Sequence, residues 1–203
     1  MTQAPTDDLR ILLDPDREQE WVEAFLTVPS EDEGIVKFYL TEQQKRIITT
    51  AKKVRKLVIV KGRQTRCSSI VLAKMVRKAT TEYGQNFVVI TQTDDMSQTF
   101  RARVQFHLQN LAEHGLEYEI GLNNEKVLEL KRMKNKIYFA SAEQKVGLRG
   151  LQTAHFIHAS EVAHWPEESA RRIIGGLLPA CPANGWFIME STPNGAAGQF
   201  YQH

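Results

Sequence analysis

Apolar residues recur along the chain with two periods, one typical of helices and one typical of strands. Apolar positions three or four residues apart predict amphipathic helices, and short continuous apolar runs predict strands that are buried on both faces. The predicted helices span residues 16–26, 41–53, 69–83 and 96–114. The predicted strands span 57–60, 86–91, 136–140, 154–159 and 186–191, and residues 117–122 and 126–131 predict a β-hairpin. Strands alternating with helices predict an α/β fold with a parallel sheet.

Charge is distributed unevenly along the 203 residues. Residues 1–40 hold ten acidic and three basic side chains, a net charge of −7, and the remaining residues have a net charge of +9. The start of the chain is thus acidic and the body basic. We divide the chain into an N-terminal arm and helix, residues 1–37, and a body of residues 38–203. A basic body suits a polyanionic partner such as nucleic acid or nucleotide, and a solvated surface is the alternative explanation.

Composition also bears on the cellular setting. No apolar run approaches the ~18 residues of a membrane span, and the acidic start of the chain is unlike a signal peptide. Cys67 and Cys181 stand far apart, without the spacing of a zinc site or a disulfide scaffold. We expect a soluble intracellular protein with reduced thiols and no membrane partner.

The stretch 57–69, LVIVKGRQTRCSS, is the strongest candidate for chemistry. An apolar strand leads into a basic loop with one glycine, and two hydroxyl side chains follow at the start of a helix. This layout is typical of a phosphate-binding loop, in which backbone N–H groups and a helix N-terminus face the anion. The predicted ATP-binding residues of the loop are Lys61, Gly62, Arg63, Gln64, Thr65, Arg66, Cys67, Ser68 and Ser69.

Within this loop, Lys61 would reach the outer phosphates, and Ser68 would hold Mg²⁺, or Ser69 if the register slips by one. The usual pattern G-x-x-x-x-G-K-[ST] fails, because Arg66 and Cys67 stand where Gly-Lys is expected. The alternative interpretation is a buried strand, a basic turn and a helix N-cap at Ser68.

Two glutamines lie upstream of the loop. Thr41 followed by Gln44 is a capping box, which is a structural role for Gln44. Alternatively, Gln43 or Gln44 hydrogen-bonds the adenine edge of ATP.

A second candidate group follows the strand 154–159. Glu161 comes directly after the carboxyl end of this strand, where a general base would polarise the water that attacks the γ-phosphate. Ser160 precedes it and would contribute to the Mg²⁺ shell only through a water molecule. The alternative for Glu161 is a surface carboxylate at a strand end. His155 and His158 point to opposite faces of the strand, which disfavours a metal cluster of the nearby histidines.

A third candidate group follows the strand 186–191. Ser191, Thr192, Pro193 and Asn194 place hydroxyls and an amide at a strand terminus, where they would sense the γ-phosphate and couple hydrolysis to motion. The alternative is an ordinary Pro-Asn-Gly turn.

Taken together, these motifs resemble the ATPase domain of the large terminase subunit of tailed bacteriophages. The resemblance rests on Lys61-Gly-Arg-Gln-x-x-x-Ser-Ser69, on Arg149-Gly150 ahead of the Ser160-Glu161 strand, and on Glu190-Ser-Thr-Pro-Asn-Gly195. It implies a RecA-like P-loop ATPase with an additional strand between the phosphate loop and the catalytic-glutamate strand. It also implies that Lys61 acts from the front of the loop and that Arg149 is an arginine finger acting in trans. Arg66 departs from the usual glycine, and Ser160 departs from the usual Asp.

The resemblance further implies ATP and Mg²⁺ as cofactors and translocation of double-stranded DNA into a procapsid as the function. The implied partners are DNA, the portal protein, the procapsid and the small terminase subunit. The implied state is a homo-oligomeric ring at the portal vertex and a monomer in isolation, within the host cell cytoplasm. No second acidic cluster fit for two metals follows, so we expect no nuclease activity. Two alternatives stand beside this motor: another nucleic-acid-dependent ATPase, and a non-hydrolysing DNA-binding or scaffolding domain with a degenerate loop.

Overall fold

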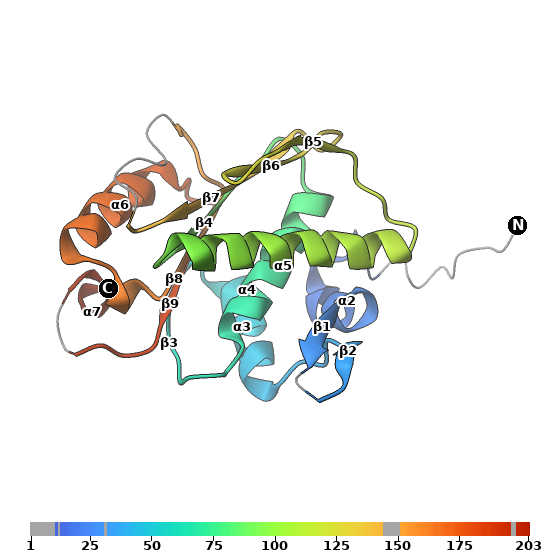
Figure 1. Cartoon of the computed structure of the whole chain (residues 1–203), viewed down its shortest axis with the longest axis horizontal. Helices are drawn as coiled ribbons and strands as arrows, with labels where there is room; N and C mark the ends of the chain where they lie inside the picture. Colours follow the sequence, from blue (N-terminus) through green and yellow to red (C-terminus); the bar gives the residue numbers. More distant parts are fainter. Residues whose placement is uncertain (1–10, 12, 31, 144–150, 196–197) are drawn as a thin grey trace, which may run out of the picture.

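A computed structural model of the chain describes residues 11, 13–30, 32–143, 151–195 and 198–203. It shows a central sheet with helices packed on both faces (Figure 1). The sheet contains β3 Lys56–Val60, β4 Asn86–Thr91, β5 Ile120–Asn123, β6 Val127–Leu130, β7 Asn135–Ser141, β8 Phe156–Ser160 and β9 Trp186–Ser191. The helices are α2 Glu18–Phe25, α3 Glu42–Lys53, α4 Cys67–Thr81, α5 Asp94–Glu113, α6 Glu167–Ala180 and α7 Gln199–Gln202. The short elements are η1 Pro15–Arg17, η2 Val162–His164 and a hairpin of β1 Thr27–Ser30 and β2 Gly34–Lys37.

The strand order in the sheet is β3-β9-β8-β4-β7-β6-β5. The strands from β3 to β7 in this order are parallel, and β6 and β5 extend the sheet in antiparallel pairing. Strand β9 lies between β3, which leads into the loop at Lys61, and β8, which ends at Ser160. The predicted additional strand between the phosphate loop and the Glu161 strand is therefore confirmed.

Two apolar clusters cover the two faces of the sheet. On one face, α2, α3, α4 and α5 pack against strand residues such as Phe87, Phe156 and Ile188. On the other face, α6 packs against Ile157 and Phe187. Because the central strands are covered on both sides, almost every residue in β4, β8 and β9 is buried, as expected for a parallel sheet.

The N-terminal helix shares this core with the rest of the chain. Trp21 and Val22 of α2 are fully buried in the same cluster as α4. The Glu18 carboxylate of α2 accepts hydrogen bonds from Lys74 Nζ of α4 at 2.7 and 3.0 Å. Burial lowers the pKa of Lys74, and the Glu18 charge opposes this shift. Helix α2, which lies before the boundary after residue 37, therefore shares its apolar core with α4.

The helices and strands predicted from periodicity are all present, with ends shifted by a few residues. Helix α6 and the β1–β2 hairpin were not predicted. Helix α6 contains Gly175, Gly176 and Pro179, residues that disfavour helices by propensity, and burial of Ile174 and Leu177 stabilises it instead. No helix in the described part of the chain combines the length and apolar character needed to span a membrane.

A buried histidine gives a prediction about stability. His107 on α5 is 3% exposed, and its ring stacks on Phe38 at 6.5 Å between centroids. Burial, helped by the Arg103 charge, lowers the pKa of His107 from 6.5 to about 4. Between these pH values the unfolded chain binds a proton that the folded chain does not, so the free energy of unfolding falls as the pH drops. We expect a loss of roughly 2–4 kcal/mol across this window.

Denaturant titrations at several pH values between 4 and 6.5 measure this effect. His107→Leu should reduce the slope, whereas His114→Leu, at the exposed end of α5, serves as the control. An unchanged slope in folded His107→Leu would show that other groups govern the acid sensitivity.

Candidate active site

The carboxyl ends of β3, β9 and β8 meet at one edge of the sheet. Strand β3 leads into Lys61, β9 into Thr192, and β8 into Glu161. Backbone hydrogen bonds tie these ends together: Lys61 N donates to Ser191 O at 3.0 Å, and Glu161 N donates to Glu190 O at 2.8 Å. The three candidate groups thus lie side by side, at the edge where parallel α/β sheets bind ligands.

The loop after β3 has an unusual backbone. Gln64 and Arg66 both adopt left-handed conformations, with φ of 60° and 52°, which non-glycine residues rarely occupy. Arg66 stands where the resemblance expects glycine, and it adopts a conformation that glycine would favour. Such strain persists only where surrounding contacts enforce it, and here Gln44 Nε2 donates to Arg66 O at 3.2 Å. Arg66 therefore adopts the left-handed conformation with its carbonyl held by Gln44.

Helix α4 begins at Cys67, and Arg66 is its N-cap, without a side-chain cap. The interpretation of Ser68 as the helix N-cap is therefore wrong, and its hydroxyl is used elsewhere. Ser68 Oγ donates to Glu190 Oε1 at 2.7 Å and accepts from Lys61 Nζ at 3.3 Å. Both Ser68 and Lys61 thus point into the junction between the loop and the sheet.

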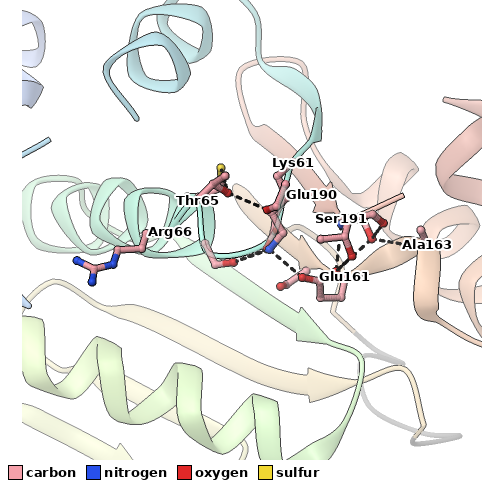
Figure 2. A network of polar contacts seen from close by, with 12 residues as sticks. Lys61, Thr65, Arg66, Glu161, Ala163, Glu190 and Ser191 are labelled. Atoms are coloured by element: carbon pink, nitrogen blue, oxygen red, sulfur yellow. Dashed lines mark hydrogen bonds and ion pairs between the residues drawn. The ribbon is translucent and has the colours of Figure 1, made fainter. Parts of the chain in front are cut away.

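Lys61 is the centre of a charged network (Figure 2). Its Nζ lies 2.5 Å from Glu190 Oε2 and 2.8 Å from Glu161 Oε1. Burial alone would lower the pKa of Lys61, but the two carboxylates raise it overall. The side chain of Arg66 points away from this network. Lys61 is therefore the ammonium at the centre of this network, and its role toward the outer phosphates stays a prediction.

Glu161 lies just beyond β8 in a left-handed conformation, with φ of 57° and ψ of 40°. Its Oε2 accepts hydrogen bonds from Thr192 N and Thr192 Oγ1, both at 3.2 Å, and from Ser191 Oγ at 3.3 Å. Its other oxygen pairs with Lys61. The interpretation of Glu161 as a free surface carboxylate does not describe this structure, because the segment after β9 fixes the side chain.

The predicted coupling segment also contacts the turn after Glu161. Ser191 Oγ accepts from Ala163 N at 3.2 Å, and Asn194 Nδ2 donates to Ala163 O at 3.0 Å. Thr192 Oγ1 lies 2.8 Å from His164 Nε2. Pro193 is exposed and continues the chain toward Asn194. Any movement of this segment would therefore reach Glu161 through direct hydrogen bonds.

The two upstream glutamines occupy different environments. Gln44 is 1% exposed and forms the predicted capping box with Thr41, and its amide also holds the loop at Arg66. Both polar atoms of its side chain are thus engaged within the protein. Gln43 is exposed and lines a pocket of about 370 Å³ between α3 and β3. That pocket shares Lys61, Gly62, Thr65 and Cys67 with the loop.

A second pocket, of about 340 Å³, lies over the loop itself. It is lined by residues 61–69 together with Glu161, Thr192 and Arg103 from α5. Arg63, Gln64 and Ser69, which were predicted to bind ATP, are among the lining residues. Arg103 was not predicted for the site, since its place on a long helix gives no indication that α5 crosses in front of the loop. The pocket combines backbone N–H groups, cations and one carboxylate, a suitable lining for a phosphate chain.

For two of the predicted site residues, Ser160 and Arg149, the structure describes no side-chain hydrogen bond. Ser160 is 1% exposed, and its Oγ has no hydrogen-bond partner among the described residues. Arg149 lies outside the residues that the structure describes, and its role as an arginine finger stays a prediction. The sequence analysis also missed Glu190 as a site residue, although a carboxylate inside an otherwise apolar strand is itself a signal.

Comparisons with known proteins connect this geometry to a fold. No protein-family model and no curated protein matches the sequence. Among solved structures, the large terminase of bacteriophage HK97 matches with a TM-score of 0.72 and 12% identity, covering 92% of this chain and 39% of that chain. The large terminase ATPase domain of Thermus phage P74-26 matches with a TM-score of 0.60 and 22% identity, covering 81% and 69% of the two chains. This chain has the fold of a phage large-terminase ATPase domain.

A third match is the large terminase of a thermophilic bacteriophage in complex with ADP, with a TM-score of 0.56, 15% identity and coverage of 77% and 40%. The predicted RecA-like P-loop fold, with its additional strand, is confirmed by these terminase structures. The chain spans about two fifths of the length of the HK97 terminase. Its terminase-type fold places Lys61, Glu161 and the segment after β9 at one site.

Proposed function

We propose that this chain is the ATP-hydrolysing motor domain of a viral DNA-packaging terminase, which drives double-stranded DNA into a procapsid. The observation that carries the proposal is the convergence of Lys61, Glu161 and Thr192 beside the loop pocket, on a terminase-type fold. One matching terminase was solved with ADP, which supports nucleotide as the ligand of this pocket.

The described residues suit MgATP. The loop pocket takes the phosphates, with the α4 N-terminus and Lys61 as the cationic elements. The neighbouring pocket takes the base, and Gln43 rather than Gln44 supplies an amide there. The orphaned Ser160 hydroxyl and the Ser68 hydroxyl are hard oxygen donors of the kind that Mg²⁺ and its water shell prefer. When bound, Mg²⁺ would neutralise charge that develops on the phosphates.

Glu161 acts as the general base for water attack. Its carboxylate is held by Thr192 and Ser191, so its orientation responds to the position of that segment. Lys61 pairs with the same carboxylate, and turning the ammonium toward a phosphate would free the Glu161 oxygen for water. Ser191, Thr192, Pro193 and Asn194 therefore couple the state of the phosphate site to movement.

A packaging motor requires partners and an assembled form. We propose double-stranded DNA, the portal protein, the procapsid and the small terminase subunit as partners. A homo-oligomeric ring in the host cytoplasm, docked transiently at the portal vertex, is the proposed working form. A binding domain with a degenerate loop is the competing function, and the sequence feature that favours it is Arg66-Cys67 in place of Gly-Lys. ATP hydrolysis by the purified chain separates the two.

Lys61→Ala tests the phosphate site. The variant removes a charge-assisted contact of roughly 1.5–3 kcal/mol, so we expect nucleotide affinity to fall by about 10–100-fold or hydrolysis to be lost. Equilibrium binding of a fluorescent ATP analogue measures the change. Lys56→Ala, an exposed lysine at the opposite end of β3, is the matched control. Wild-type turnover and affinity in Lys61→Ala would contradict the role of Lys61.

A further inference from the structure

The resemblance expects an Asp directly before Glu161, but this chain has Ser160 there. The carboxylate of Glu190 lies next to Ser160 on the neighbouring strand. P-loop ATPases hold Mg²⁺ with the loop Ser or Thr and an Asp at the end of the catalytic strand. Here that strand position is Ser160, whose short hydroxyl cannot supply a negative charge. Glu190 is the residue directly opposite Ser160 in the β8–β9 ladder. In a parallel pair, residues in register point to the same face, so the Glu190 carboxylate lies beside Ser160 on the neighbouring strand.

Glu190 contacts the residues predicted to bind Mg²⁺ and the phosphates. Its Oε1 accepts the Ser68 hydroxyl at 2.7 Å, which joins it to the predicted Mg²⁺ ligand of the loop. Its Oε2 lies 2.5 Å from Lys61 Nζ, the cation predicted for the phosphates. Glu190 is 0% exposed and sits at the carboxyl end of β9, between the phosphate-loop strand and the Glu161 strand. A buried carboxylate in an apolar strand is costly unless a cation compensates it.

Two basic side chains surround the Glu190 carboxylate. Lys61 Nζ lies beside Oε2. The His158 ring lies 3.4 Å from Oε1, with both side chains fully buried. Glu190 thus lies in a setting of cationic and hydrogen-bonding groups at the base of the loop.

We propose that Glu190 is the acidic residue of the Mg²⁺ site, which it forms with Ser68 in place of an acid at position 160. The proposal rests on the proposed ATPase function and assigns to that site a residue on β9. Among the described residues, no group of three or more His, Cys, Asp or Glu side chains is placed to hold a metal. This suits Mg²⁺, which takes one or two protein ligands and completes its shell with phosphate oxygens and water. Lys61 is then the cation that shares Glu190 with the metal.

The alternative is a purely structural Glu190 that anchors the loop through Lys61. The two roles differ in their dependence on metal. If Glu190 holds Mg²⁺, its loss weakens nucleotide binding only when the metal is present. If Glu190 anchors the loop, its loss weakens binding equally with Mg²⁺ and with EDTA.

Glu190→Gln is the decisive variant. Glutamine keeps the size and hydrogen-bonding capacity toward Ser68, and Lys61 retains its pair with Glu161, so the fold should persist. Affinity for fluorescent ADP is measured across a Mg²⁺ titration and in EDTA, and Mn²⁺ binding to the ADP complex is followed by electron paramagnetic resonance. We expect affinity in EDTA to stay within a few-fold of the wild-type value and the apparent metal affinity to fall by roughly 10–100-fold.

Two further variants complete the test. Glu129→Gln removes a carboxylate from β6 that lies 3.8 Å from Lys136, and it should leave the metal titration unchanged. The double variant Ser160→Asp/Glu190→Gln places the carboxylate on β8 instead of β9. The dependence of ADP affinity on Mg²⁺ should then return. Glu190→Asp keeps the charge and should retain metal dependence, which provides a second test if the glutamine variant unfolds.

Equal losses of ADP affinity with and without Mg²⁺ in folded Glu190→Gln would overturn the assignment, as would an unchanged metal titration. A folded double variant that fails to regain metal dependence would also count against it. If the wild-type chain binds neither ADP nor ATP, the proposed function fails and this inference fails with it. If only the metal titrations disagree, the ATPase assignment stands and the role of Glu190 is wrong.

Discussion

Replacing Glu161 by glutamine is expected to leave ATP binding intact while hydrolysis falls by roughly 10²–10⁴-fold. Glutamine preserves the shape of the side chain and can still accept the hydrogen bonds from Thr192. It cannot take a proton from water, so the chemical step is lost while the pocket keeps its lining. The salt bridge to Lys61 is also lost, but Lys61 keeps Glu190 as a partner.

Single-turnover hydrolysis and equilibrium binding of ATP, measured on the same preparation, separate these effects. Glu167→Gln is the control, because Glu167 is an exposed carboxylate at the start of α6 that pairs only with Arg171 among the described residues. Loss of ATP binding in folded Glu161→Gln would instead identify Glu161 as a structural residue of the loop.

Replacing Arg149 by alanine is expected to lower ATP turnover in an assembled ring by roughly 10³–10⁵-fold, the range that arginine fingers contribute. Arg149 stands between Gly147-Leu148 and Gly150 in the sequence, and the terminase resemblance assigns a finger acting in trans to this position. Guanidinium suits the charge-dense transition state better than an ammonium does. In trans, the arginine would complete a site on the neighbouring subunit, so the isolated chain should hydrolyse ATP faster when it is concentrated.

Mixing Arg149→Ala with Glu161→Gln tests this role directly. Each variant is inactive alone, but a mixed ring contains interfaces where an intact Glu161 site meets an intact Arg149 from its neighbour. Recovery of hydrolysis in the mixture supports a finger in trans. Persistent inactivity in rings shown to be mixed, or normal hydrolysis by assembled Arg149→Ala, would contradict it.

The sequence predicted the sheet well because its central strands are mostly apolar. Runs such as 86–91 and 186–191 are covered on both faces, so their composition alone marks them as buried. Helix α6 was not predicted because its two glycines and its proline have low helix propensity. Tertiary packing overrides that propensity. The resemblance implied only that one strand lies between β3 and β8, and the order of the other strands came from the structure, since pattern alone carries no information about which strands are neighbours.

The sequence also indicated which site residues follow the ends of strands, but not those that lie inside a strand or on a helix. Lys61, Glu161 and Thr192 follow apolar strands directly, so the rule about carboxyl ends of parallel strands brings them together. Glu190 lies one residue inside its strand, and Arg103 lies on a helix, so no such rule applies to them. A contact of Gln43 or Gln44 with adenine stays a prediction, and only the structure shows that the Gln44 amide is used by Thr41 and Arg66.

The central claim is that this chain hydrolyses ATP, and steady-state phosphate release measures it most directly. The purified chain, at a concentration high enough for subunits to associate, is incubated with ATP, Mg²⁺ and duplex DNA, with Glu161→Gln prepared identically to exclude contaminating ATPases. We predict phosphate release that depends on Mg²⁺, increases with protein concentration and disappears in the variant. Tight binding of duplex DNA, with phosphate release no greater than that of Glu161→Gln at every concentration, would contradict the motor assignment and support the non-hydrolysing domain.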